Sequence, residues 1–264
     1  MHRLAARMDD EFELVAGAFS SNEENGKRTG ERLHLAPERC YASYQQMVQS
    51  EVARDDGIDV VAIVTPNHLH APIAVEFLRS GIDVICDKPL CTSYSEALQL
   101  ADVVRETGRQ LILTHNYSAY PLIREARSRI LAGELGEIRY IEVEYLQQWL
   151  ATRLEETENK QASWRTDPQK AGAGCIGDIG THAWQLASFV TGMLPEAICA
   201  ELTSIIPGRV LDDDVRVQMR YHNGAKGRLW RAKWPVVKKT GCDYAYMAAK
   251  GVFHFPKKIL INYG

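Results

Sequence analysis

The sequence predicts an α/β protein, with a Rossmann-like doubly wound parallel sheet followed by an α+β domain whose sheet is mostly antiparallel. Between residues 11 and 114, short apolar runs alternate with helical segments, a rhythm typical of parallel strands joined by helical crossovers. In the second half the strand-like runs are longer, and residues 215–221 alternate apolar with polar side chains. Such alternation predicts a strand with one face in water, as antiparallel sheets allow.

The elements of the first half are marked by apolar runs and helix caps. The segment 59–64 ends in a continuous apolar run, which predicts a parallel strand buried on both faces. Ser93 with Glu96 three residues later forms a capping box, and Gly108 ends that helix. We expect strands at 12–19, 59–64, 83–86 and 110–114, and helices at 23–33 (capped by Asn22), 44–51, 70–80 (closed by Gly81) and 93–107.

The elements of the second half are expected in a different order. Helices are expected at 122–131 and 181–191, and strands at 138–146, 197–206 and 215–221. The change of rhythm places a domain boundary near residue 120. The loops 147–162 and 207–214 lie between these elements, and the run of three aspartates at 212–214 is expected to be a solvated turn before a strand.

Composition and charge exclude several classes of protein. The chain of 264 residues has no run of 18 apolar residues, which argues against a membrane span. Its six cysteines form no Cys-x-x-Cys pair, so we interpret them as reduced thiols of a cytoplasmic protein. Residues 231–264 carry a net charge of +6, so residues 1–230 carry −9 within the total of −3. An acidic body argues against nucleic acid as a partner.

The segment from Gly174 to His182 is the strongest candidate for chemistry. Asp178 and His182 are four residues apart at the start of a helix, so both project from one face. Lys88 follows a strand, and open α/β sheets bind their ligands at the carboxyl ends of strands. Lysine, aspartate and histidine together make a proton-transfer site. The alternative is that Asp178 caps the helix and His182 is merely buried.

Three polar turns follow successive strands of the first half. They are Thr65-Pro66-Asn67, Asp87-Lys88-Pro89 and His115-Asn116-Tyr117. Rossmann-like sheets place a nucleotide in the crevice at this edge, so the three turns predict a nucleotide site. Each turn by itself is also compatible with an ordinary connection, because Asn and Pro are common turn residues.

These motifs resemble the Gfo/Idh/MocA oxidoreductases, NAD(P)-dependent enzymes that act mainly on sugars and polyols. The resemblance runs from residue 1 to about residue 230. It rests on Thr65-Pro66-Asn67-x-x-His70, on Asp87-Lys88-Pro89, and on Trp164-Arg165 followed by Asp178-x-x-x-His182. It implies an incomplete dinucleotide-binding domain at 1–120 and a substrate and oligomerisation domain at 121–230, with a basic tail at 231–264.

The resemblance also implies roles for the matching residues. Lys88 would orient a sugar or polyol hydroxyl and favour its deprotonation, His182 would be the general base, and Asp178 would bind a neighbouring hydroxyl. Hydride would pass from the carbinol carbon to the nicotinamide. The residues implied to line the cofactor are Thr65, Pro66, Asn67, His70, Asp87, Lys88 and Asn116, with Trp164 and Arg165 closing over it. A homo-dimer or tetramer is the implied assembly.

The sequence leaves the choice between NAD and NADP open. NAD-specific sites usually place an acidic residue after the second strand, and here Glu23 and Glu24 come slightly late. Ser20 and Ser21, with a basic residue such as Lys27 or Arg28 nearby, would instead accept a 2′-phosphate.

Both ends depart from the family pattern. No Gly-x-Gly-x-x-Gly turn is present, and residues 1–8 resemble the rest of the helix that should follow it, so we expect the first strand and phosphate turn to be missing. Where Ile-Tyr-Gly is expected, the chain has Tyr246-Met247-Ala248. We hypothesise that residues from about 231 onward are an out-of-frame reading of a longer gene.

Three functions therefore remain for the chain. It is an active sugar or polyol dehydrogenase, a catalytically impaired relic of the family, or a non-catalytic binding protein that uses its basic tail. Two weaker chemistries are a zinc site from His68, His70 and His182, which lacks supporting ligands, and a Cys175 nucleophile with no dedicated base.

Overall fold

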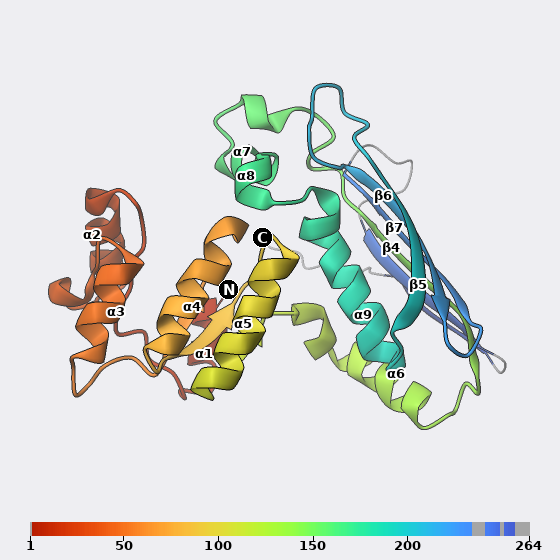
Figure 1. Ribbon diagram of the computed structural model, residues 1–264, viewed down its shortest axis with the longest axis horizontal. Helices are drawn as coiled ribbons and strands as arrows, with labels where there is room; N and C mark the ends of the chain where they lie inside the picture. The colour runs from red at the N-terminus through yellow and green to blue at the C-terminus, as the bar shows by residue number, and fades with distance from the viewer. Residues whose placement is uncertain (1, 234–240, 249–250, 257–264) are drawn as a thin grey trace. The chain divides into compact units, whose positions relative to one another are not determined.

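The computed structural model describes residues 2–233 and the backbone of residues 241–248 and 251–256. The chain divides into two compact units (Figure 1). The first contains the residues up to 65 together with 69–114, and the second contains residues 66–68 together with those from 115 onward. Each unit encloses its own cluster of buried hydrophobic residues.

The first unit is built on a three-stranded parallel sheet in the order β1-β2-β3. Val61 pairs with Val84, and Ile85 pairs with Ile112. The strands are β1 (Val60–Ile63), β2 (Asp83–Cys86) and β3 (Leu111–Leu113), joined by α4 (His70–Arg79) and α5 (Tyr94–Thr107). Before them come α1 (His2–Arg7), α2 (Glu23–Arg32), the 3-10 turn η1 (Pro37–Arg39) and α3 (Tyr44–Val52), while η2 (Asn67–Leu69) precedes α4.

Helices α4 and α5 lie side by side and pack on one face of this sheet. Phe77 of α4, Val84 of β2 and Leu100 of α5 are completely buried there. Helices α4 and α5 lie within one residue of the bounds that the sequence indicated. Ser93 and Glu96 form the expected capping box, and Gly108 closes α5 in the left-handed conformation at φ 66°. The Rossmann-like βαβαβ pattern is confirmed.

Two expectations for the first unit were wrong. The predicted strand at 12–19 is reduced to a single bridge between Gly17 and Cys40, in which the Gly17 amide donates to the Arg39 carbonyl and the Gly17 carbonyl accepts from the Tyr41 amide. A strand needs a longer neighbouring backbone, and among the described residues only 39–41 pair with this segment. Strand β1 is not buried on both faces. Ile63 faces the helices, whereas Ala62 is exposed and Val64, just after the strand, is 60% exposed.

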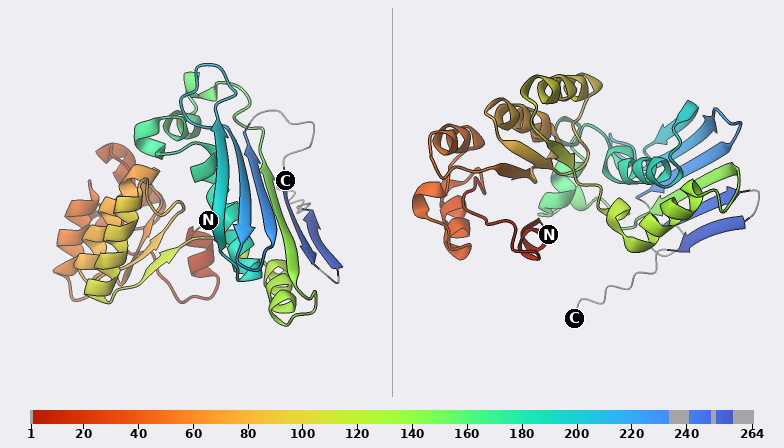
Figure 2. Two further views of the ribbon diagram at one scale, coloured as in Figure 1. Left: turned by 45° about the vertical axis from the view of Figure 1, so that its right-hand side comes forward. Right: turned by 90° about the horizontal axis from the view of Figure 1, so that it is seen from below.

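The second unit is built on a mixed six-stranded sheet (Figure 2) in the order β5-β6-β7-β4-β8-β9. Four of its five pairings are antiparallel, which confirms the mostly antiparallel prediction, and only β4 with β7 is parallel. Its strands are β4 (Ile138–Leu146), β5 (Pro195–Thr203), β6 (Asp214–Tyr221), β7 (Lys226–Ala232), β8 (Gly241–Ala248) and β9 (Gly251–Pro256).

Helices α6 (Pro121–Leu131) and α9 (Thr181–Thr191) pack together on one face of this sheet. Their buried side chains share a cluster with β4, β6 and β7. The alternation predicted for β6 is confirmed, because Val215, Val217 and Met219 are buried and the intervening residues are exposed. Between the larger elements lie η3 (Asn116–Ala119), η4 (Leu154–Glu156), α7 (Lys160–Arg165), α8 (Pro168–Ala171) and a π-helical turn, η5 (Ile176–Gly180).

The segment predicted to be a basic tail contributes backbone to the second sheet. Residues 241–248 form β8, which pairs with β4, and residues 251–256 form β9. Residues 234–240, 249–250 and 257–264 lie outside the described residues. The hypothesis of an out-of-frame reading stays a prediction.

Candidate active site

The turn after β2 is held at the carboxyl end of the first sheet. The Asp87 amide donates to the Ile63 carbonyl at 3.0 Å. The Asp87 carboxylate accepts from the Thr114 hydroxyl at 2.8 Å and contacts His2 Nε2 at 2.9 Å. Lys88 comes next and is joined to Pro89 by a cis peptide bond. Three strands therefore present polar groups at one edge, as parallel sheets do where they bind ligands.

His70, which the resemblance implied to line a cofactor, is buried between two main-chain carbonyls, and its contact with a cofactor stays a prediction. It is 1% exposed, and its ring nitrogens lie 2.7 Å from the Pro89 carbonyl and 2.9 Å from the Thr65 carbonyl. Because both nitrogens face main-chain oxygens, the ring joins the turn after β1 to the turn that carries Lys88. The Thr65 hydroxyl is buried and has no hydrogen-bond partner within the described part of the chain.

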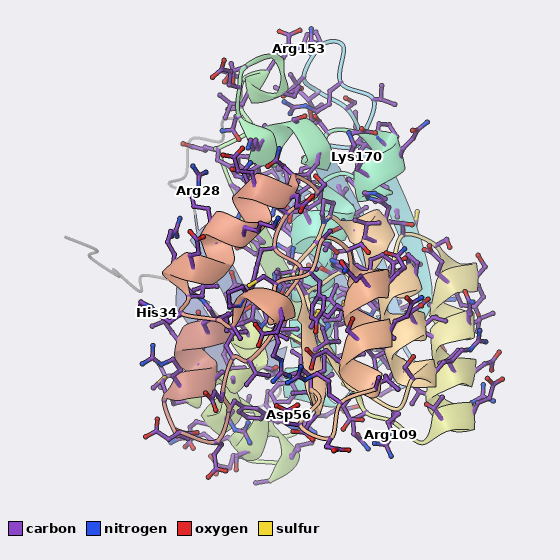
Figure 3. All side chains as sticks on the ribbon, turned by 90° about the vertical axis from the view of Figure 1, so that its left-hand side faces the viewer. Arg28, His34, Asp56, Arg109, Arg153 and Lys170 are labelled. Atoms are coloured by element: carbon purple, nitrogen blue, oxygen red, sulfur yellow. The ribbon has the colours of Figure 1, made fainter. Side chains whose placement is uncertain are left out.

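The serines weighed for a 2′-phosphate precede α2. The Ser20 hydroxyl accepts from the Asn22 amide at 3.1 Å, and Ser21 is exposed. Arg28 lies on α2 (Figure 3) and donates to the Asn25 side chain at 2.8 Å. Lys27 forms an exposed ion pair with Glu23 at 2.7 Å.

Asn67, in the second unit, uses its side-chain amide to cap a helix. Its Nδ2 donates to the Ala171 carbonyl at 2.9 Å, at the C-terminal end of α8, and the residue is 5% exposed. His68 Nδ1 lies 3.3 Å from the neighbouring Lys170 carbonyl. The Pro66–His68 segment is thereby fixed to α8. Asn116, by contrast, is exposed at the start of η3.

The glycine-rich segment is held by Asp212. Its carboxylate accepts from the Gly174 amide and from the Ile176 amide, each at 2.8 Å, and its carbonyl accepts from the Cys175 amide at 2.8 Å. A Cβ atom on Gly174 would lie 1.9 Å from the Asp212 carbonyl oxygen. Only glycine allows this approach, which fixes the start of the turn that follows.

That turn is the π-helical η5, and it carries Asp178 immediately before α9. Helix α9 starts at Thr181 with Gly180 as its N-cap and no side-chain cap bond, so the alternative that Asp178 caps the helix is wrong. π-Helical turns occur often at functional sites. Here the turn sets Asp178 just ahead of His182, in the first turn of α9.

Asp178 lies among cationic side chains. Lys233 Nζ is 2.8 Å from Asp178 Oδ2, and Arg165 Nε is 3.7 Å from Oδ1. The Lys233 side chain is 3% exposed and that of Asp178 is 17% exposed. The Arg165 guanidinium lies 4.1 Å from the centre of the Trp164 ring. Both oxygens of the Asp178 carboxylate therefore lie near a positively charged side chain.

His182 is buried among aromatic side chains that also carry hydroxyl groups. Its ring centre is 4.7 Å from that of Tyr117, 6.2 Å from that of His115 and 6.4 Å from that of Tyr145. The Tyr117 and Tyr145 hydroxyls are 2.7 Å apart, and Gln147 Nε2 donates to the Tyr145 hydroxyl at 3.1 Å. His182 is therefore buried, as the alternative to a catalytic role predicted, but it lies beside a network of hydrogen-bonded hydroxyl groups.

Several of these neighbours were missed from the sequence. Tyr117 stands in the predicted turn His115-Asn116-Tyr117, but the sequence indicated no role for its side chain. No sequence motif marked Tyr145 or Lys233, because each residue comes close to the site only through the folding of distant parts of the chain. Asp212 was expected in a solvated turn, and this was wrong, since it binds backbone amides and its neighbour Asp213 is fully buried.

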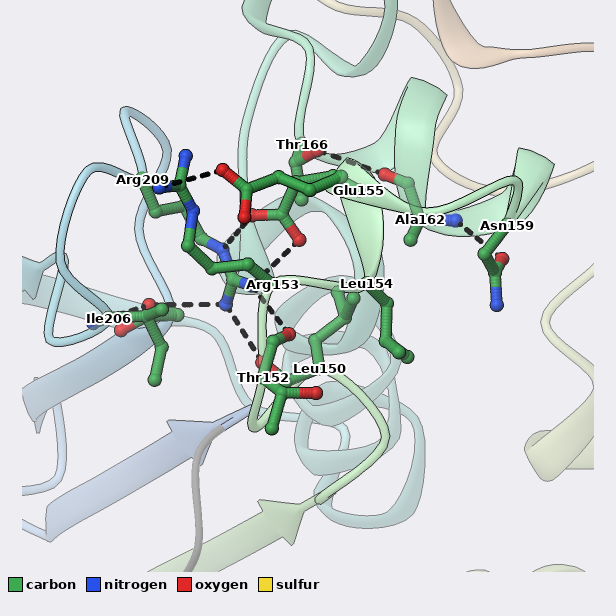
Figure 4. Close-up of polar contacts among 12 residues, drawn as sticks. Leu150, Thr152, Arg153, Leu154, Glu155, Asn159, Ala162, Thr166, Ile206 and Arg209 are labelled. Carbon is green, nitrogen blue, oxygen red and sulfur yellow. Dashed lines mark hydrogen bonds and ion pairs between the residues drawn. The ribbon is translucent and has the colours of Figure 1, made fainter.

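Arg209 contacts residues of both long loops of the second unit, 147–162 and 207–214 (Figure 4). Its guanidinium donates to the Leu150 carbonyl at 2.9 Å, to the Thr152 carbonyl at 3.2 Å and to both carboxylate oxygens of Glu155. It also meets Asp213 at 3.4 Å, and its side chain is 2% exposed. The loops 147–162 and 207–214 are thus held together by one buried cation.

The weaker chemistries gain no support. Burial raises the pKa of the Cys175 thiol, and the nearby Asp212 carboxylate raises it further, so the thiolate that a nucleophile needs is disfavoured. No group of three metal-ligating side chains occurs in the described ranges. Within the same ranges, no helix has the length and apolar character needed to cross a membrane.

The predicted catalytic residues are divided between the two units. Lys88 belongs to the first unit, whereas Asp178 and His182 belong to the second. The second unit brings Asp178 together with Arg165, and His182 together with His115 and a tyrosine pair. Cooperation of Lys88 with the other two residues stays a prediction.

Comparison with known proteins finds the same family along most of the chain. Residues 1–115 match the oxidoreductase family with an NAD-binding Rossmann fold, and residues 123–236 match the GFO/IDH/MocA C-terminal domain. The uncharacterized oxidoreductase YfiI of Bacillus subtilis is 34% identical over 87% of this chain and 59% of its own length. Levoglucosan dehydrogenase of Pseudarthrobacter phenanthrenivorans is 33% identical over 66% of this chain and 49% of its own.

Solved structures agree with this assignment. An inositol dehydrogenase homolog from Azotobacter vinelandii, complexed with NAD+, matches with a TM-score of 0.93 at 32% identity, over 97% of this chain and 66% of its own. An oxidoreductase from Sinorhizobium meliloti matches with a TM-score of 0.85 at 40% identity, over 97% and 68%. The chain spans about half to two thirds of the length of these relatives. The chain belongs to the Gfo/Idh/MocA family of oxidoreductases.

Proposed function

We propose that this chain contributes to an NAD(P)-dependent dehydrogenase that transfers hydride between a sugar or polyol hydroxyl and the nicotinamide. The observation that carries the proposal is the π-helical turn that sets a cation-bound Asp178 just ahead of His182. An acid and an imidazole placed in this way suit a substrate with adjacent hydroxyl groups. One hydroxyl loses its proton to the imidazole while its neighbour is held by the carboxylate.

Relatives support the substrate class. An inositol dehydrogenase homolog has been solved with NADH and myo-inositol, and levoglucosan dehydrogenase with NADH and levoglucosan. Both compounds are rings with neighbouring hydroxyl groups. We propose a substrate of this kind for the present chain.

The edge of the first sheet fits a nicotinamide cofactor. The buried Thr65 hydroxyl lacks a hydrogen-bond partner among the described residues, and a bound ligand would supply one. Residues proposed to hold the cofactor are Ser20, Ser21, Thr65, Pro66, Asp87, Lys88, Asn116, Trp164 and Arg165. When bound, the nicotinamide accepts or returns the hydride, and the protein supplies orientation and proton transfer.

In the proposed reaction, His182 takes the proton from the hydroxyl that is oxidised. Histidine titrates near neutral pH, which suits a general base. The tyrosine pair beside the ring fixes its position. Asp178 accepts a hydrogen bond from the neighbouring hydroxyl, and the Lys88 ammonium, a strong donor, orients the reacting oxygen and favours its deprotonation.

A titration of the purified chain with NADH and NADPH, followed by turnover with myo-inositol and levoglucosan, tests the proposal. We expect saturable cofactor binding and turnover that His182→Asn and Lys88→Met each lower by about 10²–10⁴-fold. Cofactor binding without turnover would identify a catalytically impaired relative. Polyol binding by a folded chain that binds no nicotinamide would identify a non-catalytic binding protein and overturn the proposal.

A further inference from the structure

Within the part of the chain whose side chains the structure describes, Lys233 is the most deeply buried Lys or Arg that contacts a residue of the proposed site. Its side chain is 3% exposed, and its Nζ lies 2.8 Å from Asp178 Oδ2. No residue with this role was indicated by the sequence, since 55 positions separate the two side chains. A buried ammonium is costly unless it is paired, so this contact is a requirement of the fold at that point.

The backbone of Lys233 is also fixed. Its amide donates to the Asp213 carbonyl at 2.8 Å, directly after β7 ends at Ala232. The adjacent Asp212 holds the amides of Gly174 and Ile176 at the start of the glycine-rich segment. The same loop therefore anchors the turn that carries Asp178 and the lysine that meets its carboxylate.

The two oxygens of Asp178 are approached by different cations. Lys233 takes Oδ2 at 2.8 Å, which is a charge-assisted hydrogen bond, whereas Arg165 stands 3.7 Å from Oδ1. The Trp149 ring lies 5.7 Å from Lys233 Nζ and 5.9 Å from the Arg165 guanidinium. A short bond on one oxygen fixes the rotation of the carboxylate, and the longer contact on the other is weaker.

We propose that Lys233 is a positioning residue that holds the Asp178 carboxylate in the orientation needed to receive a substrate hydroxyl. The inference rests on the proposed function, because it assigns Asp178 a ligand. Lys233 acts only through Asp178. Removing either partner should therefore cost substrate binding the same amount, and removing both should cost no more.

A double-mutant cycle tests this dependence with the full chain. Binding of myo-inositol and levoglucosan is measured by calorimetry for the wild type, Lys233→Met, Asp178→Asn and the double variant, with NADH present and absent. We expect each single variant to weaken polyol binding by about tenfold and the double variant by no more than either, since groups acting as one unit are not additive. Lys233→Arg should recover part of the loss.

Lys226→Met is the matched control. It removes an exposed lysine from the start of β7, the strand that leads to Lys233, and should leave polyol binding unchanged. Circular dichroism and urea unfolding of every variant report whether it folds. If Lys233→Met does not fold, polyol binding by Lys233→Arg is compared with polyol binding by Asp178→Asn. That comparison then decides whether Lys233 positions the Asp178 carboxylate.

The outcomes separate the inference from the proposed function. Additive losses in the double variant, or wild-type polyol binding by Lys233→Met, overturn the role of Lys233 while leaving the dehydrogenase proposal intact. If the wild type binds no polyol, the proposed substrate class fails. In that case, non-additive losses of unfolding free energy in the Lys233 and Asp178 variants show that the two residues form a structural pair only. The positioning role is then withdrawn.

Discussion

Tyr117 and Tyr145 share a hydrogen bond of 2.7 Å between their hydroxyl groups, although 28 residues separate them in the chain. Tyr117 belongs to the turn after the first sheet, and Tyr145 belongs to β4. The Tyr117 ring also contacts the His182 ring in a T-shaped arrangement. This pair therefore connects a loop, a strand and the helix that carries the proposed base.

Replacing Tyr145 with phenylalanine tests that connection. The variant removes the Tyr117 and Gln147 hydrogen bonds but keeps the ring, so we expect a loss of about 1–2 kcal/mol in unfolding free energy. Urea unfolding measures it. Tyr140→Phe is a control on the same strand. Equal stability of Tyr145→Phe and the wild type would show that the hydroxyl network does not stabilise the fold.

Replacing Gly174 with alanine should disrupt the glycine-rich turn. The added methyl group would lie 1.9 Å from the Asp212 carbonyl oxygen, a backbone atom that cannot move aside without breaking its bond to the Cys175 amide. We expect about 1–3 kcal/mol of destabilisation. Gly26→Ala in α2, where the nearest atom is 3.9 Å away, is the control and should be neutral or stabilising. A stable Gly174→Ala variant would contradict the observed packing.

Replacing Arg209 with methionine should be among the most damaging single changes. It leaves the carboxylates of Glu155 and Asp213 without their shared cation in a buried position, which typically costs about 3–5 kcal/mol. Arg220→Met removes an exposed ion pair with Glu196 and should cost at most about 1 kcal/mol. Chemical unfolding of the two variants side by side measures the difference in unfolding free energy. Similar losses in the two variants would contradict the role of Arg209 in holding the two loops together.

The Tyr41 hydroxyl predicts a stability change at high pH. Burial, aided by a hydrogen bond to Glu51, raises the pKa of Tyr41 from 10.0 to about 12. Because the folded state binds this proton more tightly, its contribution is complete below pH 10 and is lost as the pH rises towards 12. The stability advantage of the wild type over Tyr41→Phe should therefore shrink between pH 9 and 12. Urea unfolding of both proteins across this range measures it, and a constant difference would exclude the effect.

The sequence predicted best those features that depend on neighbouring residues. The capping box at Ser93 and Glu96 and the left-handed Gly108 are local, because their hydrogen bonds join residues within one or two turns. The strands at 83–86 and 138–146 were likewise recognised from composition alone. All the residues that make up each of these patterns lie within about ten positions of one another.

The sequence could not predict features that depend on a contact with a residue distant in the chain. Lys233 reaches Asp178 only because β7 ends beside the glycine-rich segment. Residues 12–19 have the composition of a strand, yet extended backbone becomes a strand only where a neighbour accepts its hydrogen bonds. His70 matched a family motif, and its burial between two main-chain carbonyls became clear only from the structure.

The parallel pairing of β4 with β7 has a consequence for how the chain folds as it is made. Tyr140 pairs with Lys226, 86 positions later. At a synthesis rate of about 5–20 residues per second, β4 would wait roughly 4–17 seconds on the ribosome before its central partner exists. During that interval its apolar face can be covered by α6 and, once residues 181–191 have been made, by α9, because both helices pack in the same cluster as β4. Early folding of the second unit would then begin with α6, α9 and β4, and closure of the sheet would be a late event.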